Sequence, residues 1–331
     1  MQIFRHLEDI PADLGPTFLS VGNFDGVHRA HQAVLRELTA RALQASATAM
    51  VVTFDPHPFR ILRPDSDLKL LTPTPVKLEL LERYGAHAVL LLPFTRDLSL
   101  MTPAEFVSQI LVRRLHAREV HEGFNFRFGH KAQGDVTLLE SLGHQLGFSV
   151  EVYPEMKIRG ETVSSSQIRR LLREGNAAKA RHLLGRVFSI LSTPGRGRGY
   201  GHKYTVPTIN LSRYDELVPK DGVYITESRI GEDSFDSITN VGTRPTFGAE
   251  SFAIESHLLN FHPIDLAADT RVELSFLHRV RDEIKFPSVE ALREQIARDV
   301  HRARRFFHLR EKLKRPAGVE ASETPQAKSP A

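Results

Sequence analysis

The stretch SVGNFDGVHRAHQAVL, residues 20–35, joins a short apolar run to a helix-like pattern through a turn with two glycines. Two histidines, His28 and His31, stand three residues apart where the helix pattern begins. A helix amino terminus offers free N–H groups and the positive end of a dipole, so a glycine-rich turn before it predicts an anion site. Gly22 and Gly26 let the main chain approach phosphate oxygens, and the histidines share one helix face. The turn therefore predicts phosphate binding by both imidazoles.

The histidine spacing alone also fits a simpler arrangement, in which one ring caps the helix and the other lies on the surface. The surrounding pattern places the motif in a fold. Apolar runs read as buried strands at residues 17–22, 48–54, 86–93, 117–124 and 148–154. Helix-period stretches separate them at residues 30–43, 75–84, 103–115 and 135–147. This alternation predicts an α/β domain with a doubly wound parallel sheet, whose ligands bind beyond the carboxyl ends of the strands.

Four polar clusters follow these strands. They are GNFDGVHRAH after the first, DPHP (55–58) after the second, GFNFRFGHKAQGD (123–135) after the fourth and SSSQIRR (164–170) after the fifth. We expect the clusters to converge at one sheet edge. Two of them have simpler alternatives: SSSQIRR also fits serine caps that open an arginine-rich helix, and DPHP also fits turn residues between prolines.

The second half has a different pattern. Two short helices are expected in residues 164–185, followed by strands without helices between them, at 185–191, 204–211, 222–230, 235–242, 251–261 and 271–280. This order predicts a closed or nearly closed antiparallel β-barrel. A final helix is expected over 288–313, with one face packed on the barrel through Val289, Leu292, Ile296 and Val300. We expect a first domain over 1–184, a second over 185–313 and a disordered tail over 314–331.

Composition narrows the class of protein. The chain has 331 residues, of which 41% are hydrophobic and 25% charged, and it has no cysteine. We therefore expect globular domains without disulfides or thiolate metal sites, in a reducing compartment such as the cytoplasm. No apolar run has signal-peptide or bilayer-spanning character, so neither export nor membrane insertion is expected. The net charge is +4, and the arginine-rich stretches lack the kind of aromatic interleaving that stacks bases, so no nucleic-acid partner is expected.

The first half resembles a known family. GNFDGVHRAH looks like the (H/T)xGH signature of nucleotidylyltransferases, and SSSQIRR looks like their second phosphate-binding motif. With TFDPHP and GFNFRFGHKAQGD in the same order, residues 15–185 resemble the FMN adenylyltransferase module of bacterial bifunctional FAD synthetases. Two positions depart from the family pattern: Ala30 stands where glycine is usual, and Asn125 where aspartate is common.

The resemblance implies that FMN phosphate attacks the α-phosphorus of ATP and that pyrophosphate leaves. It places His28 and His31 at the α-phosphate as catalytic residues, and Ser164, Ser165 and Arg169 at the β- and γ-phosphates. The full set implied for ATP is Gly22, Phe24, Asp25, Gly26, Ser164, Ser165, Ser166 and Arg169. The set implied for FMN is Asp55, His57, Asn125 and Arg127.

The second half resembles the riboflavin kinase module. YTVPTINL, DGVYIT, NVGTRPTFG and IESHLLNF occur in the family order, over about residues 185–305. The resemblance implies that Thr208 and Asn210 bind Mg²⁺ and nucleotide phosphates, and that Glu255 handles the proton of the riboflavin 5′-hydroxyl. Strand alternation puts Thr208 and Asn210 on one side. Thr205 and Val206 replace the family's usual glycine and phenylalanine.

These resemblances together imply a two-step enzyme that converts riboflavin to FMN and FMN to FAD, with ATP as co-substrate and Mg²⁺ as cofactor. A nucleotidylyltransferase with another acceptor is a second hypothesis, which the motifs of the second half disfavour. A third is a nucleotide- or RNA-binding regulator that has lost one or both activities. Intact His28, His31 and Glu255 disfavour that loss. An aminoacyl-tRNA synthetase is disfavoured by the motifs of the second half.

Overall fold

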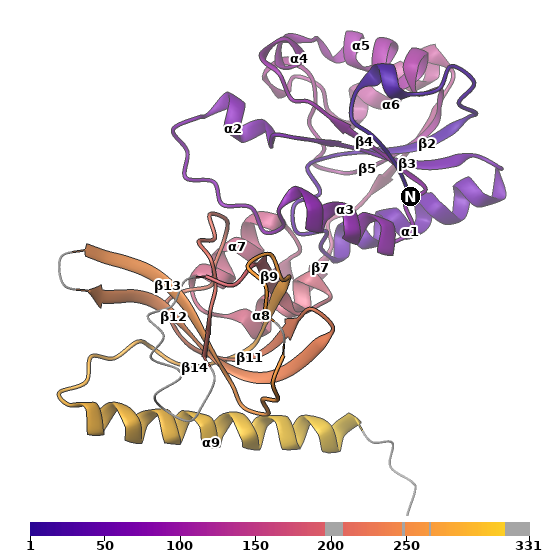
Figure 1. Cartoon of the computed structure of the whole chain (residues 1–331). Coiled ribbons are helices and arrows are strands. Elements are labelled where there is room, and N and C mark those ends of the chain that lie inside the picture. Colours follow the sequence, from indigo (N-terminus) through magenta and orange to yellow (C-terminus); the bar gives the residue numbers. More distant parts are fainter. Residues whose placement is uncertain (196–207, 247–248, 265, 315–331) are drawn as a thin grey trace, which may run out of the picture.

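The first half of the chain forms a parallel, Rossmann-like sheet. The computed structural model describes residues 1–195, 208–246, 249–264 and 266–314. Six strands lie in the order β1-β4-β3-β2-β5-β6, and every neighbouring pair is parallel (Figure 1). They are β1 (Gln2–Phe4), β2 (Thr17–Val21), β3 (Thr48–Phe54), β4 (Ala88–Leu92), β5 (Ala117–Gly123) and β6 (Ser149–Tyr153). The five expected strands are confirmed, and β1 adds an edge strand that was not expected.

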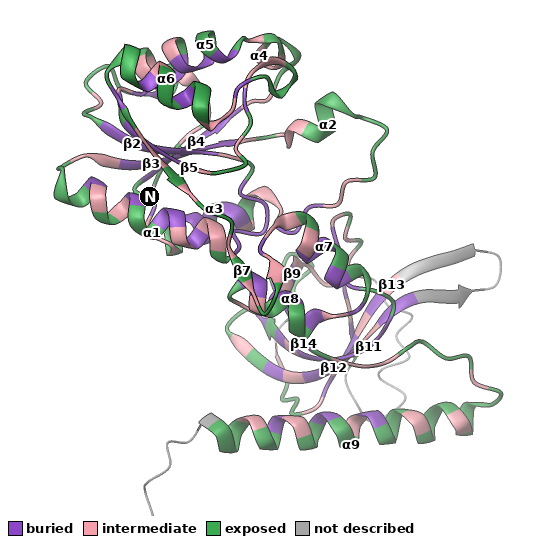
Figure 2. Ribbon diagram, turned by 180° about the vertical axis from the view of Figure 1, so that it is seen from behind, coloured by how far each residue is buried: buried purple, intermediate pink, exposed green. Residues whose placement is uncertain are grey.

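Helices cover both faces of this sheet. They are α1 (Arg29–Gln44), α2 (Pro58–Leu62), α3 (Thr74–Arg83), α4 (Arg96–Leu100), α5 (Pro103–Glu105), a π-helix (Phe106–Arg114) and α6 (Val136–Leu146), with 3₁₀ turns at Leu7–Asp9 and His130–Ala132. One core joins Leu19 and Val21 of β2 to the π-helix and α6, while Phe18 packs with α1 and α3 on the opposite face. β2 and β4 are buried at every position (Figure 2). Strands buried on both faces are mostly apolar at successive positions, and β4, AVLLL, is apolar throughout.

The strand order reverses between β2 and β5. From β2 the chain continues outward through β3 and β4, and it then returns to place β5 on the other side of β2. The main-chain N–H of Val21 donates to Glu122 Oε1 at 2.6 Å across this junction. Such a switch point leaves a crevice at the carboxyl ends of the two strands, where ligands of doubly wound sheets bind.

The second half forms the expected antiparallel barrel. Its sheet has the order β10-β13-β12-β11-β14-β9. The strands are β9 (Phe188–Ser192), β10 (Thr208–Asn210), β11 (Gly222–Ile230), β12 (Asp233–Thr246), β13 (Ala249–Leu258) and β14 (Val272–Arg281). The two edge strands meet, because Gly195 N–H donates to the Asn210 carbonyl at 2.7 Å and Ser212 N–H to the Thr193 carbonyl at 2.8 Å. These bonds close the curled sheet.

Two helices connect the sheet to the barrel. They are α7 (Ser165–Arg173) and α8 (Ala177–Leu184), and a small hairpin, β7 (Lys157–Ile158) and β8 (Glu161–Thr162), precedes them. Leu171, Leu172 and Leu184 share one buried cluster with barrel residues such as Tyr224 and Phe276. The expected pair of helices is therefore confirmed, and both helices pack on the barrel core. The domain limit at residue 184 stays a prediction.

The final helix, α9 (Val289–Lys314), packs on the barrel through only one of the four expected residues, Val300. Val289, Leu292 and Ile296 are 58%, 39% and 41% exposed, so their predicted packing on the barrel is wrong. The contact uses later residues: Ala303 and Phe307 are buried, and Val300 is partly buried beside them, against an outer barrel patch that includes Ile225 (Figure 1). Small Ala303 allows the helix to approach the sheet closely.

A closed ring of five hydroxyl groups lies inside the barrel. The hydroxyls belong to Thr226 and Ser228 of β11, Ser237 and Thr239 of β12 and Ser256 of β13, all fully buried. Thr226 bonds Ser237 at 2.8 Å and Thr239 at 2.6 Å; Ser228 bonds Ser237 at 2.8 Å and Ser256 at 2.9 Å; Thr239 bonds Ser256 at 3.0 Å. Every hydroxyl has two ring neighbours, which satisfies it without water.

Replacement of one ring hydroxyl should destabilise the barrel. Thr226→Val keeps the shape of the side chain but leaves Ser237 and Thr239 each short of one partner. We expect the free energy of unfolding to fall by about 1–3 kcal/mol, measured by urea denaturation followed by circular dichroism. Thr137→Val, at an exposed position of α6, is the matched control and should change it little. Equal stability of the two variants would contradict a satisfied buried ring.

Candidate active sites

The loop that follows β2 has a strained main chain. Phe24 and Val27 have φ of 48° and 36°, in the left-handed region that residues other than glycine rarely adopt. Gly26 between them has φ of 85°. Phe24 and Val27 are 3% and 0% exposed. Because such conformations persist only where the surroundings impose them, burial of these two side chains holds the loop in its shape. The shape turns the loop directly into α1.

Asp25 fixes this loop from inside. Its carboxylate accepts the main-chain N–H groups of Leu71 at 2.9 Å and Thr72 at 3.0 Å, and it forms a buried ion pair with Arg169 of α7. Arg169 Nε also donates to the Lys69 carbonyl at 2.9 Å. Ser165 Oγ donates to the main-chain oxygen of Asp25 at 2.8 Å. Two residues expected at the phosphates, Asp25 and Arg169, thus contact each other.

The two histidines lie together as expected from their spacing. Their rings stack with centroids 3.7 Å apart and planes 14° from parallel, and Phe24 packs on His31 at 4.8 Å. His28 stands at the cap position of α1. Both Nδ1 atoms are buried, and neither has a hydrogen-bond partner within the described ranges. Buried, unpartnered imidazole nitrogens at a helix amino terminus fit a site that awaits a polar ligand.

Both imidazoles are neutral at pH 7. Burial, followed by the positive charge of Arg186, lowers the pKa of His28 to about 4. Burial and then the neighbouring His28 hold the pKa of His31 well below its ordinary value. A neutral imidazole still has one N–H to donate, and an arriving anion would favour its protonation. The pair can therefore donate to a phosphate without carrying fixed charge beforehand.

The serines of α7 divide between two roles. Ser164 caps the helix, since its Oγ accepts the N–H of Gln167 at 3.2 Å, so the capping alternative holds for this residue. Ser165 contacts the Asp25 loop, as described above, and Ser166 is exposed. The amino terminus of α7 is thereby fastened to the loop before α1. SSSQIRR and GNFDG converge, although one lies 140 residues beyond the other.

The residues expected at FMN lie beyond the ends of β3 and β5. Asp55 is exposed, and His57 caps α2 by accepting the N–H of Phe59 at 3.2 Å, as the turn alternative anticipated. Burial lowers the pKa of His57 to about 4. Asn125 is exposed, and Arg127 forms an exposed ion pair with Asp135 at 3.1 Å. None of the four contacts the histidine pair through a bond that the structure shows within the described ranges.

Sequence reasoning missed three charged or titratable groups near this edge, two of them buried and one partly buried. Lys77 of α3 is 6% exposed, Glu122 of β5 is 4% exposed, and Arg186 donates to the Val27 carbonyl at 3.3 Å. Burial raises the pKa of Glu122 well above its usual value. Lys77 occurs within an ordinary amphipathic helix pattern, and only its burial distinguishes it from the exposed charges of α3. No motif in the sequence signals any of the three.

The kinase half presents its expected residues in one row. Asn210 of β10 pairs in register with Glu255 of β13, which pairs on its other side with Asn240 of β12. Residues paired in register project from the same sheet face, so the side chains of Asn210, Glu255 and Asn240 share one face. Thr208, which is paired with His257, lies on that face too. Asn240 Nδ2 donates to Glu283 at 3.4 Å. Asn240 and Glu283 were not expected here.

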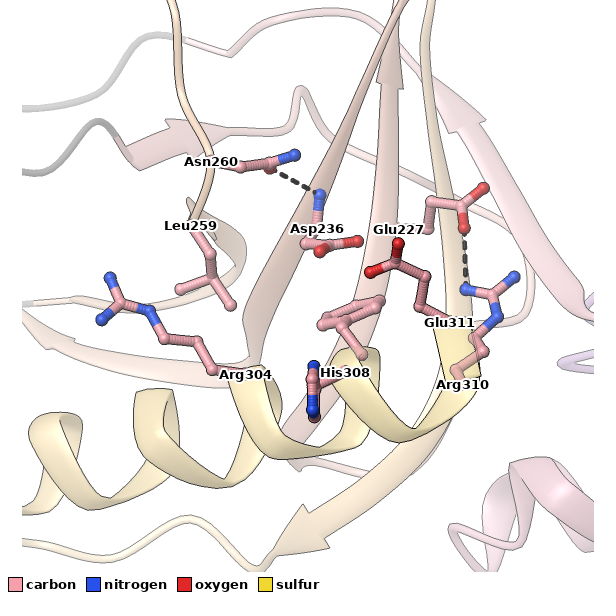
Figure 3. Close-up of a pocket in the computed structure, with 9 residues that line it drawn as sticks. Glu227, Asp236, Leu259, Asn260, Arg304, His308, Arg310 and Glu311 are labelled. Atoms are coloured by element: carbon pink, nitrogen blue, oxygen red, sulfur yellow. Dashed lines mark hydrogen bonds and ion pairs between the residues drawn. The ribbon is translucent and has the colours of Figure 1, made fainter. Parts of the chain in front are cut away.

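Two hollows lie outside these groups. One of about 440 Å³ separates the outer barrel face from α9; Arg310 and Glu227 pair across its wall at 2.8 Å, and Arg304 and His308 project from the helix (Figure 3). The other, about 450 Å³, lies beside the barrel closure and includes Tyr214. No expected site residue lines either one. Thr205 and Val206 lie outside the described residues.

Acid should weaken the fold through His28. Its pKa is about 4 in the folded protein against 6.5 for an unperturbed histidine, so between these values the unfolded chain binds more protons. Stability therefore falls as pH drops from 6.5 to 4, by up to about 3 kcal/mol for this group. We expect His28→Gln to reduce the fall, measured as urea unfolding against pH. Exposed His144→Gln is the control, and an unchanged pH slope in His28→Gln would contradict the assignment.

Comparison with known proteins follows the same division of the chain. The FAD synthetase family model matches residues 10–167, and the riboflavin kinase model matches residues 184–307. A crystal structure titled as a macrolide-efflux protein from Streptococcus pneumoniae superposes with a TM-score of 0.82 at 25% identity, over 91% of this chain and 98% of that one. In the described part of this chain, no helix is long and apolar enough to cross a membrane.

Curated relatives carry both names at once. The bifunctional riboflavin kinase/FMN adenylyltransferase of Escherichia coli (strain K12) is 34% identical, over 88% of this chain and 93% of that protein. The protein of the same name from Pseudomonas fluorescens is also 34% identical, over 92% of this chain and 97% of that protein. The identity extends across the sheet, the connecting helices and the barrel. This chain belongs to the family of bifunctional riboflavin kinase/FMN adenylyltransferases.

Proposed function

We propose that the protein phosphorylates riboflavin to FMN and then adenylylates FMN to FAD, using ATP in both steps. The observation that carries this is the presence of both family matches, in order, on one chain. No observation favours a regulator without activity. The substrates are riboflavin, FMN and ATP, and we propose domains over 1–184 and 185–313 with a tail over 314–331. The absence of cysteine supports a cytoplasmic location.

In the adenylylation step, a phosphate oxygen of FMN attacks the α-phosphorus of ATP. The bond between the α- and β-phosphates breaks, and its electrons leave with pyrophosphate. We assign His28 and His31 to the α-phosphate, because their unpartnered nitrogens stand at the start of α1. Their N–H groups would stabilise charge as it develops on the transferring group. We place Gly22 and Gly26 beside the phosphates because they carry no side chain there, while their N–H groups donate to the Val52 carbonyl and to Thr72 Oγ1. The exposed Ser166 would be a further donor.

The geometry supports a positioning role for several residues of this site. Asp25 and Arg169 hold each other, and Ser165 and Phe24 hold the loop and the His31 ring. They would keep donors within reach of the triphosphate, which is where alignment contributes to rate. Arg169 retains N–H groups beyond its two bonds and can still face the β- and γ-phosphates, near the Ser164 cap.

The residues proposed for FMN lie at the same sheet edge. They are Asp55, His57, Asn125 and Arg127, beyond the ends of β3 and β5. The exposed Arg127 guanidinium supplies positive charge that an FMN phosphate can use, since a surface ion pair such as Arg127–Asp135 is weak. We therefore place the flavin beside the end of β2, because β3 and β5 lie on either side of that strand.

In the phosphorylation step, the 5′-hydroxyl of riboflavin attacks the γ-phosphorus of ATP and ADP leaves. We assign Glu255 to accept the hydroxyl proton, because it stands in register beside Asn210 on the shared face. Thr208 and Asn210 would hold Mg²⁺, whose charge neutralises the phosphates. Their neutral oxygens suit a magnesium ion that keeps its remaining bonds to water and phosphate. No cluster of three acidic or histidine side chains gathers for a metal within the described ranges.

A product assay tests the function. Purified protein incubated with riboflavin, ATP and magnesium should accumulate FMN first and FAD later, separated by chromatography. Formation of neither product would remove the proposal. Formation of FMN without FAD would leave only the kinase activity. Formation of FAD only when FMN replaces riboflavin in the assay would leave only the adenylyltransferase activity.

Single substitutions should separate the two reactions. His28→Ala should lower FAD formation from FMN by about 10²–10³-fold and spare FMN formation, because it removes one transition-state donor. Glu255→Gln should lower FMN formation by about 10²–10⁴-fold, while supplied FMN still becomes FAD. Exposed His144→Ala and Glu232→Gln are the matched controls. Loss of both reactions in either variant would contradict separate sites.

A further inference from the structure

Lys77 is a buried cation without a counter-ion. Its side chain leaves α3, and the residue is 6% exposed. The ammonium donates to Thr53 Oγ1 at 3.0 Å and to the main-chain oxygens of Asn23 and Phe54, each at 3.3 Å. All three acceptors are neutral. Among residues 1–195, 208–246, 249–264 and 266–314, no carboxylate lies within ion-pair distance of it.

These three bonds place the charge at the nucleotide edge of the sheet. Thr53 and Phe54 end β3, and Asn23 belongs to the strained loop that leads from β2 to His28. Thr53 Oγ1 also donates to the Asn23 carbonyl at 3.2 Å, so one oxygen of the loop is held twice. Lys77 thus ties the carboxyl ends of two neighbouring strands beside the crevice of the switch point.

Burial of an unpaired ammonium costs several kcal/mol, and the surrounding charges offset this cost only in part. Asp25 already pairs with Arg169, Asp55 is exposed, and the imidazoles that face Lys77, His31 and His57, are neutral. Arg186 adds a second positive charge near the histidines. The pocket therefore has excess positive charge without its substrate, as expected where an anion binds.

We propose that Lys77 is a positioning residue for FMN adenylylation, which shapes the phosphate loop through Asn23 and supplies an uncompensated positive charge to the triphosphate of ATP. The proposal rests on the adenylylation step proposed above. The three hydrogen bonds of the Lys77 ammonium use all of its N–H groups, so it cannot contact a phosphate directly. Its charge would instead raise the affinity for ATP from a distance. The kinase reaction should not depend on it, because α3 contributes nothing to the row of Asn210 and Glu255.

The charge should make ATP affinity sensitive to alkaline pH. Burial lowers the pKa of Lys77 to about 8, while Asp25 and Asp55 act in the opposite direction. Above this pH the free protein loses the positive charge, and bound triphosphate favours its return. The KM for ATP in FAD formation should therefore rise as pH increases from 7 to 9.5. His31 and His57 stay neutral between pH 7 and 9.5. Arg186 stays charged below its pKa of about 10, so Lys77 accounts for the change in KM over the lower part of this pH range.

The test compares three variants in both reactions. Lys77→Met removes the charge, Lys77→Arg keeps a charge that does not titrate, and Lys179→Met removes an exposed lysine as control. We expect Lys77→Met to raise the KM for ATP in FAD formation about tenfold at pH 7 and to abolish its rise toward pH 9.5. Lys77→Arg should retain affinity at pH 9.5 better than the wild type does. FMN formation by the same samples reports folding and should be unchanged.

Several outcomes would overturn the proposal. A wild-type KM that stays flat between pH 7 and 9.5, or a Lys77→Met protein with wild-type KM, would remove the role of the charge. Equal loss in Lys77→Arg and Lys77→Met would leave only a structural role. If the wild type forms no FAD, the adenylylation proposal fails instead. Calorimetric titration with pyrophosphate then still decides on Lys77, because equal affinity in wild type and Lys77→Met refutes it.

Discussion

The buried carboxylate of Asp25 is the constraint on which the adenylylation site depends. It joins the loop before α1 to the main chain at Leu71 and Thr72 and to Arg169 of α7, three segments far apart in the sequence. A buried ion pair adds little stability compared with apolar packing, yet removal of one partner is destabilising because the other charge stays buried without a partner. Its value here is geometric, because it makes the strained loop and the amino terminus of α7 one unit. The stacked histidines inherit their position from that unit.

The same helix connects the two halves of the molecule. The amino end of α7 serves the loop, whereas its apolar side, with Ile168 and Leu172, belongs to the core that extends into the barrel. The barrel half reaches back as well: Glu216 accepts the N–H of Leu70 at 2.8 Å, next to Leu71, which contacts Asp25. The adenylylation loop is therefore supported by residues on both sides of the proposed domain limit.

The sequence predicted the elements well because their signals are local. Continuous apolar strands, helix periodicity and glycine-rich turns each depend on neighbours along the chain, and the histidine pair follows from a three-residue spacing. Long-range pairing leaves no such signal: that Arg169 meets Asp25, or that Lys77 is buried, follows only from the packed fold. The helix α9 shows a third limit. Its apolar positions are periodic throughout, but periodicity does not tell which turns of a long helix have a partner, and only the turns around Ala303 do.

The hydroxyl ring in the barrel fixes the register of three strands. Its members come from three adjacent strands, and each finds its neighbours only in the observed alignment of Thr226 with Ser237 and of Thr239 with Ser256. A slip of one residue would turn these hydroxyls outward and bring charged side chains such as Glu227, Asp236 and Glu255 inward. A slip of two would leave some hydroxyls facing hydrocarbon. An interior made only of apolar side chains would tolerate such shifts in register more easily. The buried hydroxyls thus favour a single alignment of β11, β12 and β13, and that alignment sets Asn240 beside Glu255.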